Sequence, residues 1–167
     1  MAWGGFAIAL FFTYLLQVGV VSILDFPAVD LFLAFALLCS LFAPTHDARI
    51  AAFLIGLAQD LGSADALGIH AFTLGLTAVL LTYIRELGNM HVWWVRGLAA
   101  VLAAWPGQLL YLLHLYYWAG TGVISIRGAV YAAGVTAIVV AVLIMFVPSL
   151  PGVIHRGSRR RYRASSA

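Results

Sequence analysis

Residues 56–70 read GLAQDLGSADALGIH and lie between two apolar runs, AAFLI before them and AFTLGLTAVLL after them. Gly62, Ser63 and Gly68 in this stretch are residue types that favour turns. The stretch therefore predicts a tight turn between two antiparallel helices, with Asp60 in the last turn of the first helix. An ionisable group beside such apolar segments needs a partner, so the turn is also the first candidate for a functional site.

The composition of the chain predicts its surroundings. Of its 167 residues, 64% are hydrophobic and only 9% are charged. A soluble domain is usually about a quarter charged, so lipid is expected around most of this chain. The predicted class is an all-α integral membrane protein. The single cysteine, Cys39, cannot form a disulfide within the chain.

The apolar runs predict six transmembrane helices in one bundle over residues 1–154. Their ranges are 3–24, 28–43, 48–62, 67–84, 97–118 and 127–148, and an arginine-rich tail follows over 155–167. A span needs about 20 apolar residues, and the second and third runs are shorter than that. These two are either tilted or re-entrant, and re-entry would change the count.

Arginine supplies all of the basic charge, and five arginines crowd the tail: Arg156, Arg159, Arg160, Arg161 and Arg163. Because cytoplasmic segments are enriched in basic residues, the tail is expected in the cytoplasm. Six spans then place both termini there, together with Arg49, Arg85 and Arg96. The loop before the fifth span, with Trp93 and Trp94, is expected on the same side. The tail would contact anionic lipid headgroups or a cytoplasmic partner.

Polar side chains should gather at the opposite, outer ends of the spans. Gly56 lies one helical turn before Asp60 on the same face, and glycine permits a neighbouring helix to come close. His70, Thr73 and Thr77 form a polar stripe at helical spacing, which should face the bundle. The candidate set for a polar pocket or partner-binding site is Asp30, Gly56, Asp60, Gly68, His70 and Arg127. In the alternative interpretation, Asp30 and Asp65 are helix N-caps and Asp60 is a paired structural charge.

The fifth span carries a stripe of small residues, consisting of Gly97, Ala100, Ala104 and Gly107. Such a stripe is typical of close helix packing in membranes. Pro106, within the same run, is expected to kink the helix because it lacks a backbone N–H group. These residues predict helix packing and no chemistry.

No enzyme motif is found in the sequence. It contains neither a GxSxG nucleophile motif nor an HExxH zinc motif, and its five histidines are scattered along the chain. Asp60 and His70 could exchange a proton, but no nucleophile is expected beside them. We therefore expect a non-enzymatic protein with no catalytic residue, no metal and no cofactor.

The order of motifs over about residues 26–86 resembles the rod shape-determining protein MreD family of bacteria. The most specific part of the resemblance comprises Gly56, Leu57, Asp60, Leu67, Gly68, His70 and Ala71. The family usually has adjacent Pro and Asp residues before the second span. Here Pro27 and Asp30 are separated by two residues, so this position departs from the pattern.

The resemblance implies a scaffold subunit of the complex that elongates the bacterial cell wall, in the cytoplasmic (inner) membrane. Its expected partner is MreC, a single-span periplasmic scaffold, near MreB, RodA and the transpeptidase of RodA. The implied fold is that of the six-helix substrate-binding subunit of ECF transporters. A small-molecule-binding subunit of a transporter is therefore the main alternative, and a small lipid-modifying enzyme is a third. Homo-oligomers are possible, and no nucleic acid is expected as a partner.

Overall fold

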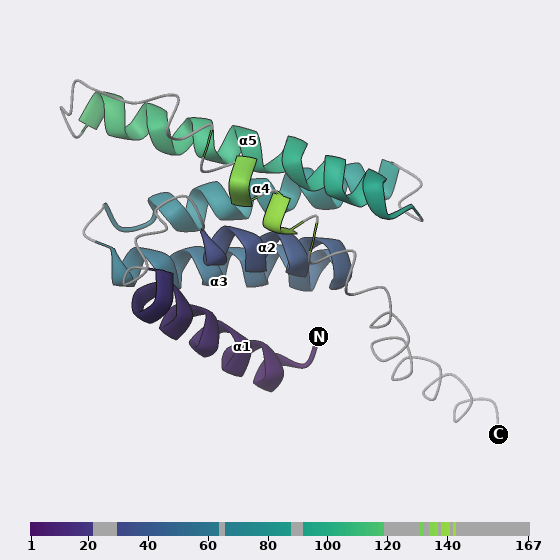
Figure 1. The fold of residues 1–167 in the computed structure, drawn as a ribbon, viewed down its shortest axis with the longest axis horizontal. Helices are drawn as coiled ribbons and strands as arrows, with labels where there is room; N and C mark the ends of the chain where they lie inside the picture. Colours follow the sequence, from purple (N-terminus) through teal and green to yellow (C-terminus); the bar gives the residue numbers. More distant parts are fainter. Residues whose placement is uncertain are drawn as a thin grey trace.

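The computed structural model describes residues 1–21, 30–63, 66–87 and 92–118, together with 131, 134–136, 138–140 and 142. Within these residues the chain is all-α, with five α-helices and one short π-helix over residues 3–118 and further helical residues between 131 and 142 (Figure 1). The elements in chain order are α1 (Trp3–Leu16), the π-helix η1 (Gln17–Val21), α2 (Leu31–Phe42), α3 (Thr45–Gly62), α4 (Ile69–Leu87) and α5 (Trp93–Trp118).

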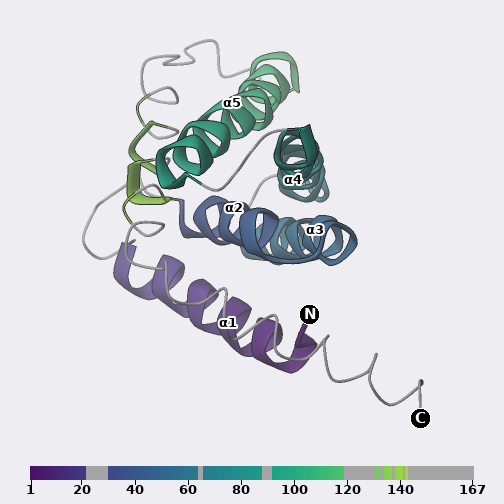
Figure 2. The same ribbon diagram turned by 90° about the vertical axis from the view of Figure 1, so that its right-hand side faces the viewer.

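The helices pack around the hairpin that α3 and α4 form (Figures 1 and 2). Helix α2 lies against both arms of the hairpin, and α5 lies against α4. Helix α1 contacts α2 and α3 on the side away from α5, as Figure 2 shows. Thr136 also reaches this bundle, because its Oγ1 accepts a hydrogen bond of 3.1 Å from the Asp30 N–H group.

Helix α2 is the most enclosed helix of the described bundle. Its buried residues are Phe32, Leu33, Ala34, Ala36, Leu37, Cys39, Ser40 and Leu41. They cover nearly the whole circumference of the helix, so neighbours surround it on all sides. A helix that is apolar all round is typical of a fully buried position. Asp30 is the N-cap of α2, and its carboxylate accepts hydrogen bonds from the N–H groups of Phe32 and Leu33.

Apart from Ile55, Leu74 and Leu81, the buried apolar side chains of α3, α4 and α5 are small, and many large ones are exposed. Nine alanines of α3, α4 and α5 are at most 3% exposed: Ala48, Ala51, Ala52, Ala71, Ala78, Ala99, Ala100, Ala103 and Ala104. On the same helices Phe53 is 50% exposed, Phe72 61% and Leu102 58%. In soluble proteins, large apolar residues are the ones usually buried. Small residues at helix contacts, with large ones outside, are typical of helices packed in a membrane.

The helix bounds overlap the predicted ranges but differ at the ends. Helix α5 begins at Trp93. The prediction that Trp93 and Trp94 lie in a loop was therefore wrong, because WWVR contains no residue that stops a helix. Helix α3 begins at Thr45, before the predicted start, since Asp47 in its first turn complements the helix dipole. Pro106 lies inside α5 without ending it.

Within the described residues, one helix is both long and apolar enough to cross a membrane, over Trp94–His114. The apolar helices over Trp3–Gly19 and Leu31–Phe42 are shorter. The six-span count therefore stays a prediction. Most of the predicted sixth span and the whole arginine-rich tail over 155–167 lie outside the described residues.

Candidate functional site at the α3–α4 turn

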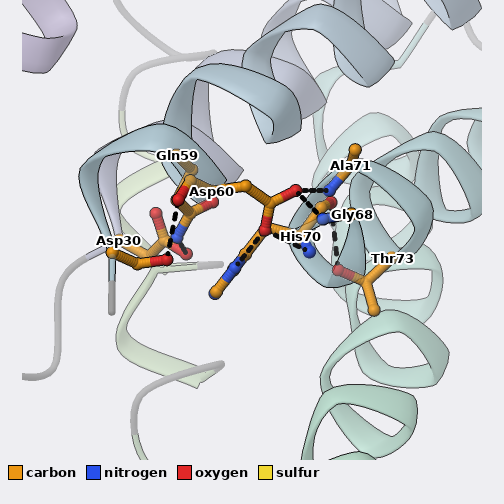
Figure 3. A network of polar contacts seen from close by, with 8 residues as sticks. Asp30, Gln59, Asp60, Gly68, His70, Ala71 and Thr73 are labelled. Atoms are coloured by element: carbon orange, nitrogen blue, oxygen red, sulfur yellow. Dashed lines mark hydrogen bonds and ion pairs between the residues drawn. The ribbon is translucent and has the colours of Figure 1, made fainter. Parts of the chain in front are cut away.

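The Asp60 carboxylate, in the last turn of α3, is the centre of a polar site at the turn between α3 and α4 (Figure 3). Asp60 is only 1% exposed. Its Oδ1 atom accepts a hydrogen bond from the backbone N–H group of His70, and its Oδ2 atom accepts from those of Gly68 and Ala71, all at 3.0 Å. The His70 Nδ1 atom lies 2.9 Å from Oδ1. Each carboxylate oxygen therefore has two partners.

These contacts make Asp60 an N-cap for a helix to which it does not belong. The first N–H groups of a helix have no partner within that helix. Gly68, just before α4, has no side chain that could cap these N–H groups. The Asp60 side chain, from the end of α3, accepts their hydrogen bonds instead. The negative charge also lies at the positive end of the α4 dipole. Asp65, an N-cap in the alternative interpretation of the sequence, lies outside the described residues.

Two glycines make this geometry possible. Gly68 has a φ angle of +98°, in a region that side-chain-bearing residues rarely adopt. At Gly56, a β-carbon would overlap the backbone of His70 and Ala71, so only glycine lets α3 and α4 approach this closely. The structure thus brings Gly56, Asp60, Gly68 and His70 together, as a joint between two helices.

His70 connects the joint to α5. Its ring lies 4.9 Å, centroid to centroid, from the ring of Tyr111, at an interplanar angle of 42°. A carboxylate can only accept hydrogen bonds, so the contact with Asp60 requires a proton on the Nδ1 atom of His70. The ring is therefore oriented from both sides, by Asp60 of α3 and by Tyr111 of α5.

The polar stripe that follows His70 faces the bundle. Thr73 and Thr77 are buried, and each hydroxyl donates to a backbone carbonyl one turn earlier, Thr73 to His70 O and Thr77 to Thr73 O. A β-carbon at Gly107 would overlap the Thr77 hydroxyl and lie 3.0 Å from Thr73 O. Glycine at position 107 therefore lets α5 pack tightly on the stripe. The predicted packing residues Gly97, Ala100, Ala104 and Gly107 are all buried.

Asp30 lies beside the Asp60 site and is joined to it through Gln59. Its Oδ1 atom accepts from Phe32 N and Leu33 N, at 2.9 and 3.0 Å. Its Oδ2 atom accepts a longer hydrogen bond of 3.3 Å from the side-chain amide of Gln59, the residue before Asp60 (Figure 3). The Oε1 atom of Gln59 is buried without a hydrogen-bond partner. Arg127, the remaining member of the predicted set, lies outside the described residues.

Arg85, near the end of α4, carries a second charged cluster at the opposite end of the hairpin. Its Nη1 atom donates to the carbonyl oxygens of Ser40, Leu41 and Ala43, at 2.9, 3.1 and 2.7 Å. Its Nη2 atom donates to Thr45 Oγ1 at 3.0 Å. Arg85 thus satisfies carbonyls at the C-terminus of α2, where a positive charge complements the helix dipole.

Sequence reasoning missed Arg85 and Gln59 as parts of these sites. Arg85 was counted only as a cytoplasmic charge, and its contacts lie 40 to 45 positions away along the chain. The available signal for Arg85 was a basic residue in the last turn of an apolar helix. For Gln59 the signal was an amide directly before the buried aspartate.

The chemistry of the Asp60 site is that of a satisfied structural joint. An ionised carboxylate offers about four acceptor positions, and four donors occupy those of Asp60. Among the described residues, no three His, Cys, Asp or Glu side chains are grouped so that they could hold a metal ion.

Comparisons of the chain with protein-family models, with curated proteins and with solved structures found no match. The resemblance to the MreD family therefore depends on the motif residues alone.

Proposed function

We propose that this chain is a non-enzymatic scaffold subunit of a bacterial inner-membrane complex, of the MreD type. In this proposal it binds a single-span partner of the MreC type and helps to maintain rod shape during cell-wall elongation. Both of its termini lie in the cytoplasm.

The observation that carries the proposal is the composition of the Asp60 site. The residues on which the resemblance depends include Gly56, Asp60, Gly68 and His70, and these are the residues that meet there. Their polar groups are used to hold α4 against α3. A site in which the charged group is fully hydrogen-bonded to the protein supports a structural role better than a reactive one.

The distribution of side chains supports a location in the membrane. Large apolar residues on α1 are exposed, with Ile8, Phe11 and Phe12 between 58% and 61%. An exposed apolar surface of this kind marks a contact with lipid or with another helix. We propose that lipid acyl chains contact the apolar surface of α1, and that the partner helix replaces lipid over part of it.

The proposal is tested by purifying the tagged full-length chain from its native membrane in a gentle detergent, followed by mass spectrometry of everything retained. The expected result is a stoichiometric protein with one membrane span and a periplasmic coiled coil. Depletion of the chain should then round the cells. A bound metabolite, or retained ATPase and coupling subunits without the single-span protein, would overturn the scaffold proposal in favour of a transporter subunit.

A matched pair of variants tests whether binding of the partner depends on the Asp60 site. Asp60→Asn removes the charge from the joint, whereas Asp47→Asn removes a charge from the first turn of the same helix. Asp60→Asn should reduce the amount of retained partner, and Asp47→Asn should leave it unchanged. Equal retention by both variants would contradict a role of the joint in presenting the binding surface.

A further inference from the structure

Arg49, in the second turn of α3, is held in a fixed orientation at the Arg85 end of the hairpin. Its Nε–H group donates to Thr82 Oγ1 of α4 at 3.0 Å, and the Thr82 hydroxyl in turn donates to Val79 O at 3.0 Å. The Thr82 oxygen is therefore oriented to accept, and it fixes the plane of the guanidinium group. A guanidinium has five N–H donors in a rigid planar arrangement, and this contact uses one of them.

The guanidinium groups of Arg49 and Arg85 bind neutral oxygens. Within the described residues, neither Arg49 nor Arg85 lies within ion-pair distance of a carboxylate. The nearby carboxylates have other partners, since Asp47 pairs with the amino group of Met1 and Glu86 accepts from the Thr45 hydroxyl. Positive charge therefore exceeds negative charge at this end of the bundle, which should attract an anion.

The side chains next to Arg49 indicate which anion fits. Phe53 and Leu57 follow Arg49 at intervals of four, so all three lie on one face of α3. Phe53 is 50% exposed and Leu57 is 37% exposed. The face therefore presents a cation near the end of the helix and an exposed apolar strip further in. A phospholipid has the complementary arrangement, with a phosphate above acyl chains.

The position of Arg49 along α3 agrees with a phosphate above acyl chains. It lies four residues into α3, which is about 6 Å along the helix axis. Tyr83 near the end of α4 and Trp94 at the start of α5 are each 57% exposed at the same end of the bundle. Exposed Tyr and Trp residues are enriched at the level of lipid headgroups.

We propose that Arg49, oriented by Thr82, binds the phosphate of an anionic phospholipid, whose acyl chain lies on Phe53 and Leu57. The planar guanidinium can donate two parallel hydrogen bonds to one phosphate group. The charge of Arg85, one turn along α4 from Thr82, adds to the attraction. This proposal rests on the proposed membrane location but not on the identity of the partner protein.

The test is native mass spectrometry of the full-length chain in detergent, titrated with phosphatidylglycerol and, separately, with phosphatidylcholine. Arg49→Gln should weaken phosphatidylglycerol binding about fivefold, the size expected for one arginine near an anionic headgroup. Arg96→Gln is the matched control, because Arg96 lies at the same end but over the Phe42 ring. It should bind phosphatidylglycerol like the unchanged protein, and phosphatidylcholine binding should be weak in every case.

Two further variants leave Arg49 in place and keep the proposal testable if Arg49→Gln does not fold. Thr82→Val should weaken phosphatidylglycerol binding by removing the orienting acceptor. Glu86→Gln should strengthen it, because a competing negative charge is lost while Gln can still accept from Thr45. Unchanged binding in both variants would overturn the proposal.

Inorganic phosphate distinguishes a lipid site from a general anion site. At millimolar concentration it should not displace phosphatidylglycerol, because it has no acyl chain for Phe53. Displacement at that concentration would show a site for a free anion only and would overturn the lipid assignment. The partner purification described above is a separate readout, so failure of the lipid proposal would leave the scaffold proposal standing.

Discussion

The two ends of the α3–α4 hairpin use opposite charges for the same task. At one end, the Asp60 carboxylate accepts from the N–H groups that begin α4. At the other end, the Arg85 guanidinium donates to the carbonyls that end α2. In each case a side chain from one helix satisfies the terminus of another, with the charge that the helix dipole favours.

The ends differ in how far apart their partners lie in the sequence and in how deeply they are buried. Asp60 is 1% exposed, and its partners lie only 8 to 11 positions further along the chain. Arg85 is only partly buried, and its partners lie 40 to 45 positions away. The Asp60 end is therefore a local joint within one hairpin, whereas the Arg85 end fastens a second segment onto that hairpin.

The largest effect is expected from Asp60→Ala. This change removes the acceptor of three N–H groups at the start of α4, of which that of Ala71 is buried. Removal of one partner from a buried charged network typically costs about 3–5 kcal/mol. The measurement is the free energy of unfolding in mixed micelles. Asp47→Ala, at an exposed ion pair, should change it by less than about 1 kcal/mol. Similar losses for the two variants would contradict a special role of Asp60.

Gly56→Ala should have the next largest effect, because the added methyl group meets backbone atoms that cannot move aside. Overpacking of this kind typically costs about 1–3 kcal/mol. Gly75→Ala on α4 is the matched control, since its β-carbon would lie at an ordinary 3.8 Å from the Phe53 ring. That change should be neutral or stabilising by up to about 1 kcal/mol, because alanine favours helices. Thermal unfolding should show a lower unfolding temperature for Gly56→Ala than for the unchanged chain, and an equal or higher one for Gly75→Ala.

Arg85→Lys should have a smaller effect than either change at the Asp60 end. Lysine keeps the positive charge, but its compact ammonium group cannot reproduce the planar set of contacts to three carbonyls and the Thr45 hydroxyl. We expect a loss of about 1–2 kcal/mol in the free energy of unfolding, since this end is partly exposed to solvent. If Arg85→Lys destabilises the chain as much as Asp60→Ala, the proposed difference between the two ends is wrong.

Gln59→Met should have the smallest effect. It removes a hydrogen bond of 3.3 Å to Asp30, but it also removes a buried carbonyl oxygen that has no partner. Loss of a weak hydrogen bond and relief of an unsatisfied acceptor oppose each other, so the net change should stay within about 0.5 kcal/mol. A loss above 2 kcal/mol, measured in the same unfolding experiment, would mean that Gln59 is essential for joining the two aspartates.

The features that could be predicted from the sequence lie mainly at the Asp60 end of the hairpin, and those that could not lie mainly at the Arg85 end. The hairpin, the position of Asp60 and the polar stripe were predictable, because turn residues, helical spacing and a buried charge all lie within one short stretch. For Asp30, the sequence predicted either a role in a polar pocket or, in the alternative interpretation, a role as an N-cap. Both predictions depended on the position of Asp30 just before an apolar run. These are local signals, and they concern the end where partners are close in sequence.

The Arg85 cluster could not be predicted in the same way. Its acceptors are backbone carbonyls, which every residue has, so no residue type near position 40 marks them in the sequence. The start of α5 was placed too late, because Trp93 and Trp94 were read as interfacial loop residues. Asp60 was recognised as buried and paired, but the backbone donors that satisfy it were not. That arrangement depends on the close approach that Gly56 permits.

Amide hydrogen exchange of the unchanged chain and of Asp60→Asn, resolved at Gly68, His70 and Ala71, tests the central claim most directly. Asparagine keeps one acceptor oxygen but loses the charge and the second oxygen. The account predicts exchange about 10- to 100-fold faster at these amides, as expected for loss of hydrogen bonds to a charged group. Amides in the middle of α2 should keep their protection. Unchanged exchange at all three amides would contradict the claim that the Asp60 side chain caps α4.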